Sequence, residues 1–173
     1  MITGNSINRL IQKYSEYALF TGGVSEERII EVENVLNTQL PGSYKWFLLH
    51  YGYGGMGGSE IEGVVPNGKM TVVERTEYYR RYGLPNHLIV IEDVGEYVNC
   101  LDISDISDED CYVVTWSMHD NDGVINKTKS FFDFLLYRFY DEDEMDDVEL
   151  YVQLEKVFDI MEELHKQKKK NSG

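Results

Sequence analysis

Apolar residues recur at helical spacing through the first third of the chain. They lie three or four positions apart within residues 6–17, 25–37 and 41–51, which places them on one face of each segment. Ser25 is a suitable cap for the second segment, and Pro41 suits the first turn of the third, where its missing N–H costs nothing. The pattern therefore predicts three helices before residue 52.

The middle of the chain changes to the pattern of short strands. We predict a strand at 59–65 and three more at 87–94, 96–103 and 111–118, because these runs are rich in β-branched and aromatic residues between turn-forming segments. The sequence Thr-Val-Val-Glu that begins at Thr71 has the form of a capping box and predicts a short helix to about residue 82. The strands are expected to form an antiparallel sheet.

Helical spacing returns near the carboxyl end. Phe131, Leu135 and Phe139 are four positions apart after Ser130, a suitable cap, and a final helix is predicted at about 148–166. The fold class expected from these elements is α+β, with N-terminal helices packed on an antiparallel sheet and further helices at the C-terminal end. The length of 173 residues fits a single domain over 1–173.

Composition supports a packed domain and restricts its location. Hydrophobic residues make up 42% of the chain, enough to form a core. No run approaches the roughly 18 apolar residues of a membrane span, and the first residues lack the apolar stretch of a signal peptide. We therefore expect a cytoplasmic protein.

The formal net charge of −15 indicates which classes of partner the chain is suited to bind. Direct binding to nucleic acid or to an anionic membrane needs lysine and arginine, so neither is expected. Solubility alone would explain the acidic excess, but a basic protein partner would explain it equally well.

Two acidic segments are candidates for contacting such a partner. The denser one, DEDEMDD, contains Asp141, Glu142, Asp143, Glu144, Asp146 and Asp147. The second contains Asp105, Asp108, Glu109 and Asp110 and is expected to form a hairpin turn. Either segment could also be a solvated connector. Trp116 could add an exposed aromatic anchor, although a tryptophan on such a strand is more often part of the core.

No sequence match to a catalytic, metal-binding or cofactor-binding motif lies in the structural context that the motif requires. Residues 52–57 match G-x-G-x-x-G, but they follow a predicted helix and precede a strand, which is the reverse of the dinucleotide fingerprint. The acidic run from Asp102 lacks the glycine and glutamate of an EF-hand, and the histidines are scattered. We therefore expect no cofactor, no metal and no enzyme activity. Cys100 and Cys111 are predicted to be buried thiols on strands, with a disulfide as the alternative.

The order of motifs in residues 20–140 resembles the SUKH superfamily, the Smi/Knr-type proteins, and most closely the YobK-type bacterial immunity proteins. The pattern is a helix with Gly23, Ser25, Ile29, Glu33 and Leu36, then L-P-x-x-Y-K-x-F-L and a glycine cluster. The matching structural positions are Leu40, Pro41, Tyr44, Phe47, Gly52, Gly54, Gly55 and Gly63.

The resemblance implies a function but carries over no catalytic residue. It implies an α+β fold and an immunity protein that binds and neutralises a cognate toxin, often a basic nuclease domain. Two other classes remain open: an intracellular scaffold that regulates cellular partners, and a small hydrolase or ligand-binding domain that uses a cleft beside the glycines. The helix predicted at 148–166 could serve as a homodimer contact or as a packing element.

Overall fold

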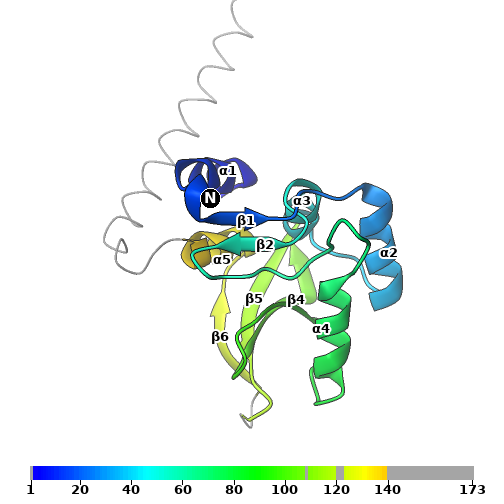
Figure 1. Cartoon of the computed structure of the whole chain (residues 1–173). Coiled ribbons are helices and arrows are strands. Elements are labelled where there is room, and N and C mark those ends of the chain that lie inside the picture. Colours follow the sequence, from blue (N-terminus) through cyan, green and yellow to red (C-terminus); the bar gives the residue numbers. More distant parts are fainter. Residues whose placement is uncertain (1, 108, 120–122, 140–173) are drawn as a thin grey trace, which may run out of the picture.

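Five α-helices, a 3-10 turn and six strands form the described part of the chain, which comprises residues 2–107, 109–119 and 123–139 of a computed structural model (Figure 1). The first half contains α1 (Gly4–Lys13), η1 (Ser15–Tyr17), β1 (Ala18–Phe20), α2 (Glu26–Leu36), α3 (Gly42–His50) and β2 (Gly54–Met56). The second half contains α4 (Thr71–Arg80), β3 (Leu88–Asp93), β4 (Val98–Ser107), β5 (Asp110–Trp116), β6 (Val124–Thr128) and α5 (Phe131–Phe139). The α+β class predicted from the sequence is confirmed.

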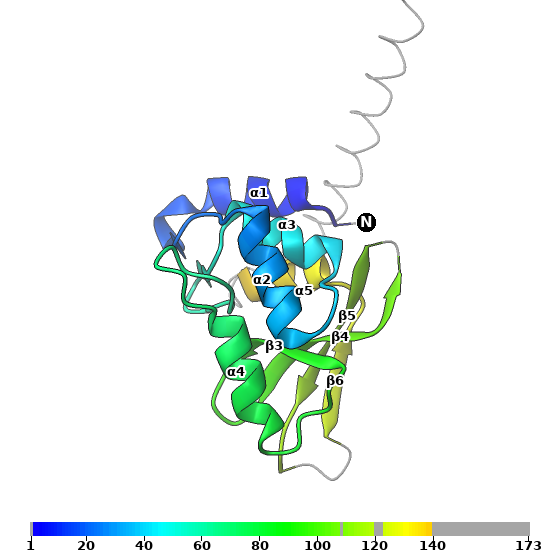
Figure 2. The ribbon, with the colours of Figure 1, turned by 90° about the vertical axis from the view of Figure 1, so that its right-hand side faces the viewer.

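The main sheet has the order β3-β4-β5-β6, and all its neighbours are antiparallel. Successive residues of β3 point to opposite faces. Ile89 and Ile91 enter a large core made with α1, α2, α3 and α5, whereas Leu88 and Val90 enter a smaller core with Tyr79 of α4. Figure 2 shows α4 below α2, beside the lower half of the sheet. Burial on both faces explains why β3 is almost continuously apolar.

The predicted helices of the first half are confirmed, with adjusted ends. The first begins at Gly4, earlier than expected, because Thr3 and Ser6 form a reciprocal cap there. Asn37 ends α2 in the left-handed conformation, at φ 51°. Gly52 follows the C-cap of α3 at φ +70°, a backbone conformation that glycine adopts without strain.

Two local predictions in the middle of the chain are wrong. Thr71 is the first residue of α4, not its cap, and its hydroxyl instead accepts from the Gly63 N–H (2.9 Å) and donates to the Gly63 carbonyl (3.2 Å). The strand predicted at 59–65 consists only of isolated bridges at Ile61 and Val64, although both side chains are buried as expected. A short strand that was not predicted, β2, lies inside the glycine cluster and pairs with β1.

The family-motif residues are structural. Leu40, Tyr44 and Phe47 are buried in the large core. A side chain at Gly63 would approach the Gly52 carbonyl to 1.9 Å, so two backbone segments cross there at a distance that only glycine permits.

Candidate functional site

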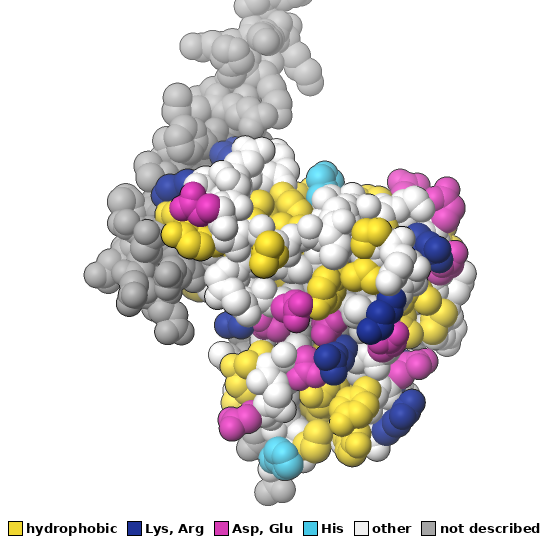
Figure 3. All heavy atoms as spheres, in the orientation of Figure 1, with side chains coloured by type: hydrophobic (Ala, Val, Ile, Leu, Met, Phe, Trp, Pro, Cys, Tyr) yellow, Lys and Arg dark blue, Asp and Glu magenta, His cyan; other side chains and the backbone are white. Residues whose placement is uncertain are grey.

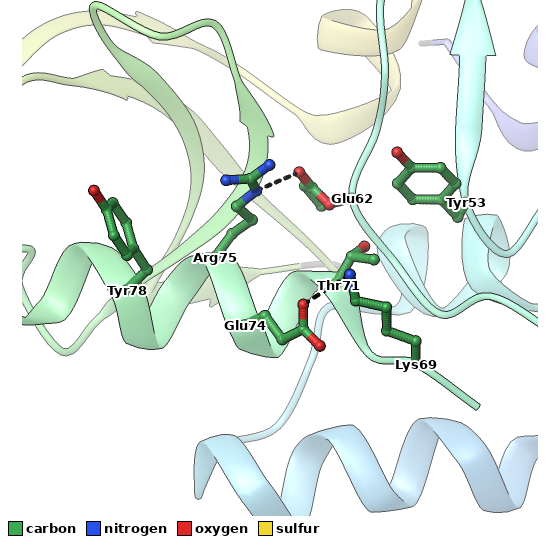
Figure 4. Close-up of a pocket in the computed structure, with 7 residues that line it drawn as sticks. All are labelled: Tyr53, Glu62, Lys69, Thr71, Glu74, Arg75 and Tyr78. Atoms are coloured by element: carbon green, nitrogen blue, oxygen red, sulfur yellow. Dashed lines mark hydrogen bonds and ion pairs between the residues drawn. The ribbon is translucent and has the colours of Figure 1, made fainter. Parts of the chain in front are cut away.

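A depression of about 370 Å³ lies between α4 and the segment that follows the glycine cluster (Figure 4). Tyr53 and Glu62 line one side of it, and Lys69 lies just before α4. The other side is formed by Thr71, Glu74, Arg75 and Tyr78, all on α4. The spacing of these four residues places them on neighbouring turns of one helix, so the depression presents several polar groups together.

Glu62 is fixed in the wall of the depression by its backbone. Its N–H donates to the Ile91 carbonyl of β3 (2.7 Å), and its own carbonyl accepts from the hydroxyl of the buried Tyr44 (2.7 Å). These bonds hold the segment between α3 and the sheet. The side chain is only 5% exposed, so a carboxyl group is held almost out of water.

Arg75 bridges the two sides of the depression. Its Nε donates to Glu62 Oε1 (3.2 Å), and its Nη1 lies 3.2 Å from Asp93 Oδ2. Asp93 in turn accepts from the Tyr79 hydroxyl (3.0 Å). Burial and, after it, the hydrogen bond to Asp93 together raise the pKa of Tyr79 to about 12. One guanidinium therefore serves two carboxylates.

The balance of charge in and beside the depression is negative. Burial raises the pKa of Glu62 and so favours its protonated form, whereas the charge of Arg75 lowers the pKa and favours the carboxylate. Lys69 and Glu74 form a separate, exposed ion pair at 3.1 Å. The pKa of Tyr53 is raised by burial and then by its hydrogen bond to Glu60.

The carboxylates therefore outnumber the cations. They are Glu60, Glu62, Glu74 and Asp93, against Lys69 and Arg75. This excess, together with the two tyrosine rings, gives the depression a composition suited to binding a cation.

Thr71 supplies the aliphatic hydroxyl of the lining. The Thr71 hydroxyl is engaged with the Gly63 backbone on both its donor and acceptor sides. Neither histidine nor cysteine is among the described residues that line the depression. A nucleophile with an adjacent base, which covalent catalysis requires, is thus not assembled by this lining.

The acidic hairpin is partly structural. Asp105 and Glu109 are exposed, as a contact surface requires. Asp110 is half-buried, and its Oδ1 accepts from the Ser43 hydroxyl (2.7 Å), the Cys111 N–H (2.8 Å) and the Phe131 N–H (3.1 Å). The structure therefore uses Asp110 to join the starts of α3 and α5 to the sheet, and β4 extends into the segment that was predicted as a turn.

Trp116 is 5% exposed and packs edge-on against Tyr79, with ring centroids 6.2 Å apart. The suggestion that it is an exposed anchor is therefore wrong, and the core alternative is confirmed. Asp108 and the acidic segment at 141–147 lie outside the described residues, as does the helix predicted at 148–166.

The other sequence motifs have simple structural explanations. The G-x-G-x-x-G match ends α3 and forms β2, so it lies in the reverse of the dinucleotide-binding context. Cys100 and Cys111 are buried free thiols on β4 and β5. Within the described residues, no three His, Cys, Asp or Glu side chains are grouped to hold a metal ion, and no helix is long and apolar enough to cross a membrane.

Sequence reasoning anticipated a cleft beside the glycines but not the residues that form it. Glu62 resembled an outward-facing residue of a predicted strand, and Arg75 an ordinary surface residue of a helix. The ion pair between Glu62 and Arg75 joins positions 13 residues apart, so it depends on the path of the segment between them. No local pattern in the sequence carries that signal.

Comparisons with known proteins agree with the fold and the sequence motifs. The family model SUKH_5, described as SMI1-KNR4 cell-wall, matches residues 5–140. A crystal structure of a protein from Pseudomonas syringae pv. tomato is similar at TM-score 0.58 and 22% identity, covering 72% of this chain and 92% of that one. At this identity, the likeness supports the fold alone.

Proposed function

The chain belongs to the SUKH family, and on that basis we propose that it is an immunity protein that binds a cognate protein toxin and blocks its active surface. The observation that carries the proposal is the family match, which spans residues 5–140 and so includes both cores and the depression. Bacterial proteins of this family are often immunity proteins.

The charge of the chain supports a basic toxin, such as a nuclease domain. A net charge of −15 would attract a positively charged active surface and speed association at low salt. The exposed carboxylates of Asp105 and Glu109 are available for such contact. We propose the acidic residues of 141–147 as a second contact region.

The proposal is tested with the toxin domain encoded beside this chain. Co-expression should restore the growth of cells that produce the toxin, and the two proteins should co-purify as a complex. Cells that die despite full expression of this chain, with no complex formed, would show that the immunity function is wrong.

The acidic contact region has its own test. Replacing the six carboxylates of 141–147 with lysine should slow association with the toxin severalfold at low salt and reduce its dependence on salt. A control with Glu26, Glu27 and Glu31 of α2 changed to lysine shows how much a smaller net charge alone slows association. Equal association rates for wild type and the 141–147 variant would remove that segment from the interface.

A ligand-binding domain is the second candidate, because the depression does bring convergent polar side chains together beside the glycine cluster. A small molecule that co-purifies with the protein and stabilises it would favour this function. A regulatory scaffold is the third candidate, and a gene neighbourhood without any toxin would favour it.

A further inference from the structure

Exposed tyrosines continue from the depression along α4. Tyr78 borders the depression and is 44% exposed, and Tyr82, just past the end of α4, is 50% exposed. Their ring centroids are 5.1 Å apart. Figure 3 shows hydrophobic side chains gathered over the lower part of α4, directly below a band of mixed acidic and basic side chains.

This combination is typical of the centre of a protein interface. Tyrosine is enriched among residues that dominate binding energy, because it buries a large rigid surface and keeps a polar end. Here the ring of Tyr78 is held from behind by Tyr79, at 5.1 Å between centroids. Tyr79 is itself fixed by the hydrogen bond to Asp93. A partner would therefore meet an aromatic surface that is already ordered.

The carboxylates at the depression beside these tyrosines share a single cation. Arg75 is the only cation within 4 Å of the Glu62 and Asp93 carboxylates among the described ion pairs, and it is shared between them. Glu60 adds a further exposed carboxylate, which accepts a hydrogen bond from the Tyr53 hydroxyl. A positive group that entered here would meet the Glu62 carboxylate and the aromatic side chains of Tyr53 and Tyr78, with Glu60 beside Tyr53.

We propose that this depression receives a lysine or arginine side chain of the toxin, and that Tyr78 and Tyr82 pack against the toxin surface around it. This inference rests on the proposed immunity function and names the part of the surface that performs it. The size of the depression, about 370 Å³, lies in the range of small-molecule sites, so a single long side chain fits with room for water. The net charge of −15 favours a basic partner over an anionic ligand.

The first experiment measures the affinity of a catalytically inactive toxin by calorimetry. The double variant Glu60→Gln/Tyr78→Ala should bind at least tenfold more weakly than wild type. The matched control is Glu16→Gln/Tyr17→Ala, which removes one exposed carboxylate and one exposed phenol from η1. It should bind within twofold of wild type. Thermal unfolding of each variant must match wild type, which is expected because all four side chains are at the surface.

The outcomes separate this site from the immunity function. If wild type binds and neutralises the toxin while the Glu60→Gln/Tyr78→Ala variant binds within threefold of it, the site is wrong and the immunity function stands. Equal losses in the variant and its η1 control would also overturn the site, because the effect would then be one of total charge.

The second experiment needs no toxin. Titration of ¹⁵N-labelled protein with the peptide acetyl-Gly-Arg-Gly-amide should shift the amide signals of Thr71 and Arg75 saturably. The same titration with acetyl-Gly-Glu-Gly-amide should leave them unchanged, and the Glu60→Gln/Tyr78→Ala variant should not respond to the arginine peptide. Absence of saturable shifts in wild type, or equal shifts with both peptides, would overturn the proposal even if the toxin binds elsewhere.

Discussion

At the scale of single residues, Asp110 shows how an acidic side chain can be structural in a chain with an acidic surface. Its Oδ1 accepts from the backbone N–H of Phe131, which begins α5, and from the Ser43 hydroxyl in α3. The neighbouring Glu109 carbonyl accepts from the Ser43 N–H (3.0 Å). Composition alone cannot separate such a carboxylate from an exposed one, because both read as acidic residues near a turn.

Asp110→Ala is therefore expected to destabilise the fold. Removal of the carboxylate leaves part-buried donors of two helices without their acceptor, which typically costs about 1–3 kcal/mol in the free energy of unfolding. Asp105→Ala, at an exposed position in the same hairpin, should change it by less than about 0.5 kcal/mol. Urea unfolding followed by circular dichroism measures both. Equal effects would contradict the structural role of Asp110.

The two thiols are predicted to be unreactive in the folded protein. Burial and, after it, the carboxylates of Asp110 and Asp102 together raise the pKa of Cys111 to about 12. Burial also raises the pKa of Cys100. Since the thiolate is the reactive form, Ellman's reagent at pH 8 should react with neither thiol over minutes, and with both in 6 M guanidinium. Rapid reaction of the folded protein would contradict the burial.

The same shifts give a pH dependence of stability. Unfolded thiols ionise near pH 8.5, whereas the folded thiols keep their protons. Their contribution to stability is therefore complete below that pH and is lost as the pH rises above it.

At the scale of elements, the helices and the central strands could be predicted because their burial is periodic. Three strands at the edges of sheets could not. β6 has mostly exposed residues, so its sequence carries no alternation. β1 and β2 have three residues each, and β2 contains Gly54, which packs closely on Leu19 of β1, and Gly55, which packs on Ser59. Such a glycine-rich segment has the sequence pattern of a turn. The segment 59–65 failed for a different reason: Ile61 and Val64 are buried, but each forms only a single bridge, to Gly54 and to Met70, so no continuous ladder forms.

The outer edge of β3 is covered by a side chain of α4, which gives a testable contact between two elements. The buried Thr76 hydroxyl accepts from the Val90 N–H (3.0 Å). Thr76→Val keeps the size but removes the acceptor, so the free energy of unfolding should fall by about 1–3 kcal/mol. Thr76→Ser keeps the acceptor and should retain slow hydrogen exchange at Val90. Equally fast exchange in both variants would show that the hydroxyl does not hold this edge.

At the scale of the whole molecule, the site arises from how distant segments meet. A buried polar row crosses the sheet from α5: Arg138 donates to Glu92 (2.7 Å), Asn99 donates to Glu92 (2.7 Å), and Thr115 donates to Asn99 (2.8 Å). Asp93, which follows Glu92 in the sequence, is not part of this row and forms an ion pair with Arg75 at the depression. Family motifs predicted the fold from the sequence, but the charged partners were not predictable, because each pair joins different elements.

Residues 1–140 should be sufficient for folding. The family match ends at residue 140, and Phe139 is the last core residue in the part of the chain that the structure describes. A chain ending at Tyr140 should therefore unfold cooperatively, with a midpoint within about 5 °C of the full chain, because that shift corresponds to roughly 1 kcal/mol. Calorimetry measures the midpoint.

The same shortened chain divides the proposed interface into its two parts. It lacks the acidic residues of 141–147 but keeps Tyr78, Tyr82 and the depression. If the depression holds the toxin and the acidic segment accelerates its approach, the shortened chain should associate more slowly while its dissociation rate stays near that of the full chain, because exposed charges at the rim act mainly on the association rate. A large rise in the dissociation rate of a cooperatively folded chain would instead place the main contacts beyond residue 140.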